Sequence, residues 1–394
     1  MSSLAEEKQN LEFLKIQRYA MGILGLDLGV TSRKQLIKSP GTLAFFTFSI
    51  VLFQYGFFNY AKDSITDIDT ITSSLSMFNQ GGLLLFKGSM LIHYGGKMLN
   101  LIWNLNSLAK EANAEEYEKW LSENRRAELL AKSYFCACLT SVVCCALLPW
   151  LFVIYEYFKG VEPHLELPFA VKFPYDDGGW IASLVIYILT LSLLRALSNT
   201  SIGIDTLFGW YIFAISGHFH ILRDKIQKAA MKIDLYDNHL DFQQDIAAFV
   251  TYHNHVAIFV EDLNELYGAI SWAEITLSCL QMCFLLYSLG NDPNLASIPF
   301  HFLATAAIII QLMIYCFGGE KLKYENDLLC KEIYMVMPWE KMHLSEKKLI
   351  LIALVRTQKE TILKGLFYHL NQSLLVFIFK TAFSFITLLG AIKE

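Results

Sequence analysis

The chain ends with the stretch GLFYHLNQSLLVFIFKTAFSFITLLGAIKE, residues 365–394, in which Lys380 is the only charge before the last two residues. An apolar helix of roughly 20 residues, rising about 1.5 Å per residue, matches a hydrocarbon core about 30 Å thick. The stretch is therefore expected to cross a bilayer. Small and polar residues within it favour a helix packed among other helices over a simple lipid anchor. These residues are Ser373, Thr381, Ala382, Ser384, Thr387 and Gly390.

The composition indicates a polytopic membrane protein. Of the 394 residues, 54% are hydrophobic and 18% are charged, whereas a soluble domain carries about 25% charged residues. The net charge of −5 comes with no basic tail, which argues against a nucleic-acid partner. The opening MSSLAEEKQNLEFLK is too charged for a cleaved signal peptide, so the N-terminus is expected to stay in the cytosol.

The order of apolar and charged segments predicts an all-α fold with seven transmembrane helices. Residues 1–38 are expected to form a cytosolic N-terminal helical segment, and residues 39–222 are expected to contain the first four spans. Cytosolic helices are expected at residues 223–267, followed by the fifth and sixth spans at residues 268–319. Two amphipathic cytosolic helices are then expected at residues 320–364, and the seventh span at residues 365–394. A proline-rich segment after the third span predicts a structured external loop that could cover a pocket.

Basic residues are biased to one side of this arrangement. The N-terminal segment and the connections on its side hold 24 Lys and Arg, against four on the other side. The positive-inside rule then places the N-terminus in the cytosol and the C-terminus outside. This orientation argues against a G-protein-coupled receptor, and the Asp-Arg-Tyr and Asn-Pro-x-x-Tyr motifs of that family are missing from the third and seventh spans.

Charged and sulfur-containing residues in the apolar stretches predict structural roles. Arg195 and Asp205 would each cost roughly 2.5–3.5 kcal/mol at mid-bilayer, so we expect them to face protein or water. The cysteines of the apolar run at 136–145 have no histidine at ligand spacing, so we expect packing residues and no metal site. The motifs GxxxxGK[ST], HExxH and GxSxG are absent, so neither an enzyme activity nor a cofactor is expected.

Three ordered motifs resemble the insect odorant receptor family. The segment LPFAVKFPYD at 167–176 resembles the family's second external loop, and KTAFSFITLL at 380–389 resembles its terminal motif. The segment YCFGGEKLKYENDLLCKEIYMVMPWEKM at 315–342 resembles the signature after the sixth span. The matching positions in that signature are Tyr315, Cys316, Gly319, Glu320, Tyr334 and Trp339.

The resemblance implies a ligand-gated, non-selective cation channel built as a tetramer around one pore. Because residues 223–267 are too few for the long insertion of the family's co-receptor, the chain resembles an odorant-specific tuning subunit that assembles with co-receptor subunits in the plasma membrane of olfactory sensory neurons. Alignment on Ser384 and Phe385 implies that Leu388 and Ile392 form the pore gate. Without the resemblance, Leu388 and Ile392 would equally suit packing against lipid or another helix.

The family's odorant site implies a pocket for a small volatile in the outer half of the membrane, among the second, third, fourth and sixth spans. The candidate ligand contacts in those halves are Leu75, Met77, Phe78, Leu148, Trp150, Leu151, Tyr155, Ser183, Leu184, Tyr187, Phe300, His301 and Thr305. Each could also be an ordinary core residue, and His301 could be a solvated span-end histidine. A self-sufficient gustatory-type channel of the same topology and a transporter stay open as alternatives.

Overall fold

The protein is all-helical, as the sequence predicts. The computed structural model describes residues 12–30, 32–63, 68–160, 165, 171, 179–236, 239–291, 298–358 and 362–393. The predicted external loop lies largely outside these residues. No β-strand forms within the described part of the chain, which contains two isolated β-bridges. The helices are η1 (Glu12–Leu14), α2 (Lys15–Ile23), α3 (Arg33–Leu36), α4 (Pro40–Asp63), α5 (Ile68–Lys110), α6 (Ala114–Lys159), α7 (Trp180–Tyr236), α8 (His239–Asn291), α9 (Ile298–Val336), α10 (Leu344–Gln358) and α11 (Gln372–Lys393).

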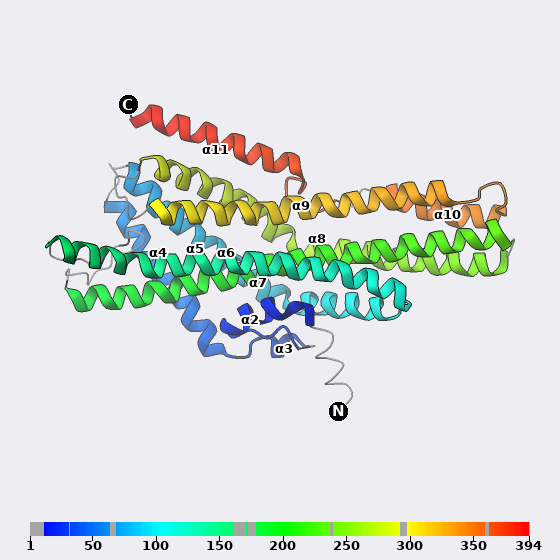
Figure 1. Ribbon diagram of the computed structural model, residues 1–394, viewed down its shortest axis with the longest axis horizontal. Coiled ribbons are helices and arrows are strands. Elements are labelled where there is room, and N and C mark those ends of the chain that lie inside the picture. Colours follow the sequence, from blue (N-terminus) through cyan, green and yellow to red (C-terminus); the bar gives the residue numbers. More distant parts are fainter. Residues whose placement is uncertain are drawn as a thin grey trace.

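Seven helices, α4 to α9 and α11, correspond to the seven predicted spans (Figure 1). Among the described residues, α4, α6, α7, α8 and α9 are long and apolar enough to cross a membrane, and α11 contains a shorter apolar helix. The 57-residue α7 is about 85 Å long at 1.5 Å per residue. This is nearly three times the thickness of a hydrocarbon core, so much of α7 lies outside any bilayer that it crosses.

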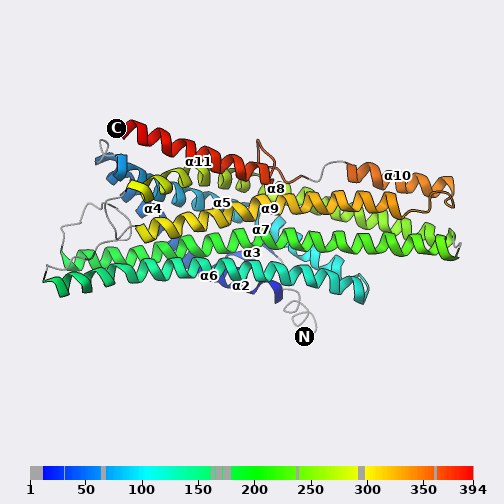
Figure 2. The same ribbon diagram turned by 45° about the horizontal axis from the view of Figure 1, so that its top comes forward.

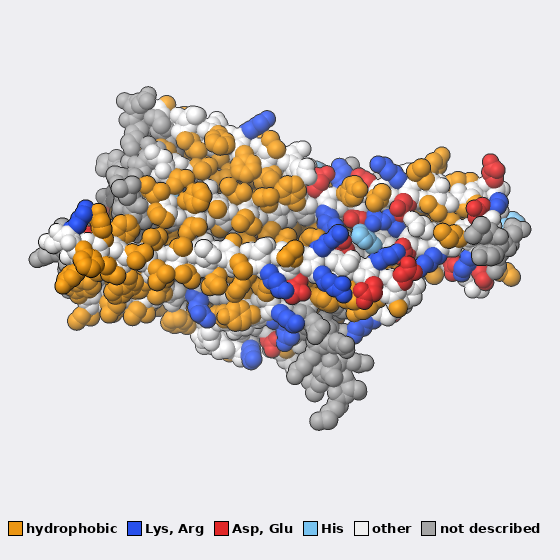
Figure 3. Space-filling model, in the orientation of Figure 1, with side chains coloured by type: hydrophobic (Ala, Val, Ile, Leu, Met, Phe, Trp, Pro, Cys, Tyr) orange, Lys and Arg blue, Asp and Glu red, His pale blue; other side chains and the backbone are white. Residues whose placement is uncertain are grey.

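The surface divides the bundle into an apolar half and a charged half. Figure 3 shows hydrophobic side chains over the half that contains α11, and Lys, Arg, Asp and Glu side chains over the other half. The predicted cytosolic connections are continuous with the spans: α6 combines residues 114–132 with the third span, and α7 continues beyond the fourth. The surface of the apolar half is thus suited to contact lipid, whereas the surface of the charged half is suited to contact water.

The start and end of α6 follow from local chemistry. The Asn113 side chain accepts a hydrogen bond from the Glu116 backbone N–H at 2.9 Å, and the Glu116 carboxylate accepts from the Asn113 N–H at 3.4 Å. This capping box satisfies two backbone donors that have no partner inside the helix. The helix ends at Gly160, whose φ of 71° lies in the left-handed region that glycine adopts without a steric cost.

An ion triad is buried where four helices meet. Lys87 of α5 lies 2.7 Å from the Asp205 carboxylate of α7 and also pairs with Glu274 of α8, and all three side chains are fully buried. Two residues of α9 complete the cluster, because Gln311 donates to Asp205 Oδ2 and the Tyr315 hydroxyl donates to Asp205 Oδ1, both at 2.8 Å. Asp205 therefore faces protein, as predicted, whereas Arg195 is exposed on α7.

Two residues of the signature after the sixth span, Gly319 and Glu320 of α9, contact the segment where α11 begins. A Cβ added at Gly319 would lie 2.1 Å from the backbone oxygen of Leu370, so only glycine lets the connection to α11 approach α9 this closely. One residue later, the Glu320 carboxylate accepts a hydrogen bond from the Gln372 N–H at 3.4 Å. The Asn371 side chain accepts from the Leu374 N–H at 2.8 Å and caps the start of α11.

Replacing Lys87 with methionine should strongly destabilise the fold. The substitution leaves Asp205 and Glu274 buried without a cation, and breaking a buried ion pair from one side costs about 3–5 kcal/mol. The measurement is the thermal unfolding of detergent-purified receptor together with its amount at the cell surface.

Lys97→Met is the matched control on the same helix. Lys97 pairs with Glu265, but the two side chains are 57% and 53% exposed, so water can replace the lost contact. Equal effects of Lys87→Met and Lys97→Met would contradict a structural role for the triad.

Candidate functional site

An apolar cavity of about 110 Å³ lies among α5, α6, α7, α8 and α9 and is called the Phe300 cavity here. A cavity of about 150 Å³ lined by apolar side chains accepts benzene, so this space suits part of a small organic molecule. Most of its lining is aliphatic, aromatic or sulfur-containing. The lining residues are Met77, Gln80, Tyr134, Cys138, Ser141, Val142, Cys145, Leu194, Leu197, Ser198, Ser201, Gln281, Phe300, Leu303, Ala304, Ala307, Ile308 and Gln311.

The Phe300 cavity adjoins the buried ion triad. Gln311 lines the cavity and donates a hydrogen bond to Asp205, which pairs with Lys87. A few hydroxyl and amide groups in an otherwise apolar wall are typical of sites that orient a small ligand. A molecule in this cavity would therefore touch a side chain that belongs to the polar core of the bundle.

Phe300 and Met77 are the two sequence-predicted contacts that line the Phe300 cavity. His301 and Thr305 are buried in α9, where the Thr305 hydroxyl donates to the His301 carbonyl at 2.7 Å. The Tyr187 hydroxyl donates to the Ala146 carbonyl at 2.5 Å, and the Tyr187 ring packs edge-on against Trp150. The remaining candidates are half-buried (Leu75, Leu148, Ser183) or exposed (Phe78, Trp150, Leu151, Tyr155, Leu184).

The lining residues not found from the sequence are mainly small or polar. Ser198 and Ser201 are three residues apart on α7, and Gln281 and Gln311 are amides inside apolar helices. An amide in a membrane span must face protein or a cavity, because lipid offers it no hydrogen bonds, whereas a hydroxyl can also bond a carbonyl of its own helix. This rule would have selected the two glutamines in preference to the aromatic residues near the helix ends.

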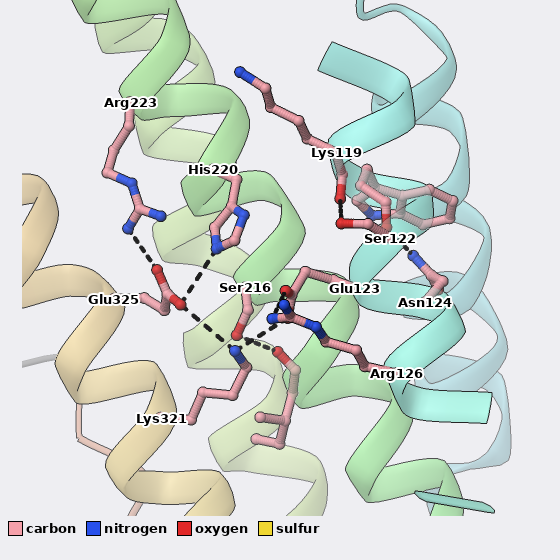
Figure 4. Close-up of polar contacts among 12 residues, drawn as sticks. Lys119, Ser122, Glu123, Asn124, Arg126, Ser216, His220, Arg223, Lys321 and Glu325 are labelled. Carbon is pink, nitrogen blue, oxygen red and sulfur yellow. Dashed lines mark hydrogen bonds and ion pairs between the residues drawn. The ribbon is translucent and has the colours of Figure 1, made fainter. Parts of the chain in front are cut away.

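A second cavity of about 310 Å³, called the Phe317 cavity here, lies among α6, α7 and α9. Tyr134 lines both cavities, and Lys321 lines only this one. Figure 4 shows the polar network that joins the same three helices, with Lys321 directed at Glu123 (3.0 Å) and Glu325 (3.5 Å). The Phe317 cavity therefore opens beside the ion pairs of the charged half.

Glu325 also pairs with His220 and Arg223 of α7 in this network. Its carboxylate lies 2.5 Å from Arg223 and 3.3 Å from His220 (Figure 4). Burial alone would raise the pKa of Glu325, but His220 and Arg223 outweigh burial and lower it to about 2. Because this pKa is below the usual value, the pairing stabilises the fold above about pH 4.5 and its contribution is lost as the pH falls toward 2.

Helix α11 lies at the edge of the bundle, against α8 and α9 (Figures 1 and 2). Its buried side chains are Leu375, Ile378 and Ala382, and Phe385 packs edge-on against Phe284 of α8. Its opposite face is open. This face carries Val376, Phe377, Lys380, Phe383, Ser384, Thr387 and Leu388.

The predicted gate residues belong to the end of this helix. Leu388 is 57% exposed on the open face of α11, one turn after the exposed Ser384. Ile392 also lies within α11, but its side chain falls outside what the structure describes. The isolated subunit thus presents Leu388 for contact with another chain or with solvent.

The fold is that of a polytopic helical membrane protein. Its internal apolar cavity can hold part of a small organic molecule. The family model described as "7tm Odorant receptor" matches residues 67–383. Two relatives in Drosophila melanogaster, Odorant receptor 45a and Odorant receptor 47a, are each 25% identical. The first match covers 97% of this chain and 99% of the relative, and the second 96% and 98%. The chain belongs to the insect 7tm odorant receptor family.

Solved structures show the same fold. The insect olfactory receptor OR5 from Machilis hrabei superposes with a TM-score of 0.77 at 14% identity, over 99% of both chains. The complex of OR5 with eugenol superposes with a TM-score of 0.80 at 15% identity, over 98% of both chains. This chain and OR5 therefore share a fold although few of their residues are identical.

Filling the Phe300 cavity should weaken the response to an activating volatile. Ala307→Leu adds three carbon atoms to the lining and removes space that a ligand would occupy. We expect the concentration for half-maximal response to rise about tenfold or more, measured by current or calcium entry in cells that express the complete receptor.

Ala306→Leu makes the same change at the neighbouring position of α9, which does not line the Phe300 cavity. Surface expression of both variants, measured in parallel, separates loss of ligand response from misfolding. A normal response of Ala307→Leu, at normal expression, would show that the Phe300 cavity is not the ligand site.

Proposed function

We propose that this chain is the odorant-binding subunit of a heterotetrameric, ligand-gated, non-selective cation channel. The Phe300 cavity supports this proposal, because its apolar wall meets the ion triad where Gln311 donates a hydrogen bond to Asp205. A small volatile would occupy this cavity in the outer half of the membrane. We further propose that the receptor resides in the plasma membrane of olfactory sensory neurons, a location that its membership of the odorant receptor family supports.

Burial of apolar surface supplies the binding energy. At about 25 cal/mol per Å², a volatile that buries roughly 250 Å² gains roughly 6 kcal/mol. The loss of translational and rotational freedom on binding opposes much of this gain. Affinity is therefore modest, and ligands of similar shape compete for the same cavity, as suits a receptor for volatile molecules.

The ion triad supplies a route from the Phe300 cavity to α11. Gln311 of α9 contacts Asp205, and Lys87 connects Asp205 to Glu274 of α8. Helix α8 packs along α11, and the Tyr368 hydroxyl, just before α11, donates to the Trp272 carbonyl at 2.6 Å. A ligand that displaces α9 therefore changes contacts of the helix that supports α11, which couples binding to the pore if the two arrangements differ in ligand affinity.

The open face of α11 supports its placement at a central pore. Four copies of α11 around one axis would bring four Leu388 side chains together, with Ser384 one turn earlier and Ile392 one turn later, while Phe385 packs against α8 and holds the helix on its own subunit. A ring of such apolar side chains blocks ions by excluding water, and a wider ring admits them. The short connection at 223–267 suits the odorant-specific subunit, with co-receptor subunits as its partners.

The experiment that tests this proposal is whole-cell recording in cells that express the chain with and without an insect odorant co-receptor, during a panel of volatiles and with nucleotide-dependent signalling blocked. A fast cation current that requires the co-receptor is the expected result. Current from this chain alone would favour the self-sufficient gustatory-type homotetramer. A response that disappears with the signalling block would defeat the channel proposal.

Replacing Leu388 with serine should produce current in the absence of ligand. A hydroxyl in place of an isobutyl group lowers the cost of wetting the gate, so the closed pore should leak. The measurement is basal current per unit of surface receptor, which should rise several-fold over the wild type.

Val376→Ser is the control, because Val376 is also an exposed aliphatic residue of α11 but lies three turns before Leu388. Its basal current should stay at the wild-type level. If Leu388→Ser conducts only with ligand, like the wild type, Leu388 does not line the gate.

A further inference from the structure

Two histidines and a glutamate converge at the end of the bundle remote from the C-terminus of α11, where α8 begins and α10 begins (Figure 1). His239 is the first residue of α8, His343 directly precedes α10, and Glu346 lies in the first turn of α10. Their ligand atoms all lie within 4.8 Å of one another. The cluster thus joins segments more than 100 positions apart in the sequence.

The geometry is close to that of a metal site. His239 Nδ1 lies 3.1 Å from Glu346 Oε1, and the ring centroids of His239 and His343 are 4.0 Å apart. Metal–ligand bonds of about 2.0–2.2 Å in a tetrahedron place ligand atoms roughly 3.4 Å apart. The His239–Glu346 distance already matches this spacing, and a side-chain rotation of the exposed His343 would bring in the third ligand.

The surroundings hold Glu346 and the backbone around His343 in place. Glu346 is 2% exposed, and its other oxygen accepts a hydrogen bond from the His343 backbone N–H at 2.7 Å. The Lys341 amine, two residues before His343, contacts the Asp234 carboxylate of α7 at 3.0 Å and its carbonyl at 2.9 Å. The connection between α9 and α10 is therefore fixed on both sides of His343, which limits the entropy lost when a metal binds.

We propose that His239, His343 and Glu346 form a binding site for a divalent transition metal, with Zn²⁺ as the best match. Imidazole nitrogens select zinc and its neighbours over Mg²⁺ and Ca²⁺, which require more oxygen ligands. Three protein ligands leave a fourth position for water. The bound metal ties the first residue of α8 to the α9–α10 connection and so stabilises the charged end of the bundle. This site is independent of the odorant-gated activity.

The test is metal binding to the purified, chelator-treated receptor complex. Co²⁺ is titrated first, because four-coordinate Co²⁺ absorbs visible light, and Zn²⁺ is then added to displace it. The variants are His343→Gln, His239→Gln and the control His255→Gln, an exposed histidine of α8 outside the cluster. Mg²⁺ in excess serves as the comparison ion, and thermal unfolding is followed with and without Zn²⁺.

The wild type and His255→Gln should bind one more Zn²⁺ per chain than His343→Gln, and Zn²⁺ should raise their melting temperatures. The His343→Gln and His239→Gln variants should bind at least about tenfold more weakly and show no such rise. Because His343 is exposed, its substitution should leave folding without metal unchanged. Equal Zn²⁺ binding by all variants, or displacement of Co²⁺ by Mg²⁺, would overturn the proposal.

Discussion

The Lys87 ammonium, shared between two buried carboxylates, is the interaction on which the packing of the long helices depends. Charges without water are stable only when they are paired, so Asp205 of α7 and Glu274 of α8 must both stay within reach of α5. Gln311 and Tyr315 add α9 to the same constraint. Four helices that could otherwise slide along apolar faces are thereby held in one register.

This constraint lies between two regions of different chemistry. On one side is the Phe300 cavity, with apolar walls and few polar contacts; on the other is the charged half, where ion pairs such as Arg223–Glu325 join the helices. The charged half therefore acts as a rigid support. Helix α11 packs at the bundle edge, mainly on α8 and α9, and its opposite face is exposed.

The sequence predicts the fold well, because apolar period, helix length and charge bias are local properties. The buried position of Asp205 also follows from the cost of a charge in a span. Its partner does not, because Lys87 is 118 positions away and only the packing of α5 against α7 brings the two together. The cavity is harder still to predict: Trp150 and Leu151 resemble pocket residues but are exposed, whereas Cys138 and Ser201 line the Phe300 cavity.

A volatile that occupies the Phe300 cavity would reach the ion triad through Gln311. The most direct measurement is electron cryomicroscopy of the assembled receptor, with and without a saturating activating volatile. The expected result is ligand density bounded by Met77, Phe300 and Gln311, with a shift of α9 and α11 between the two states. Ligand density in the Phe317 cavity, or on the exposed face around Trp150, with the Phe300 cavity unchanged, would contradict it.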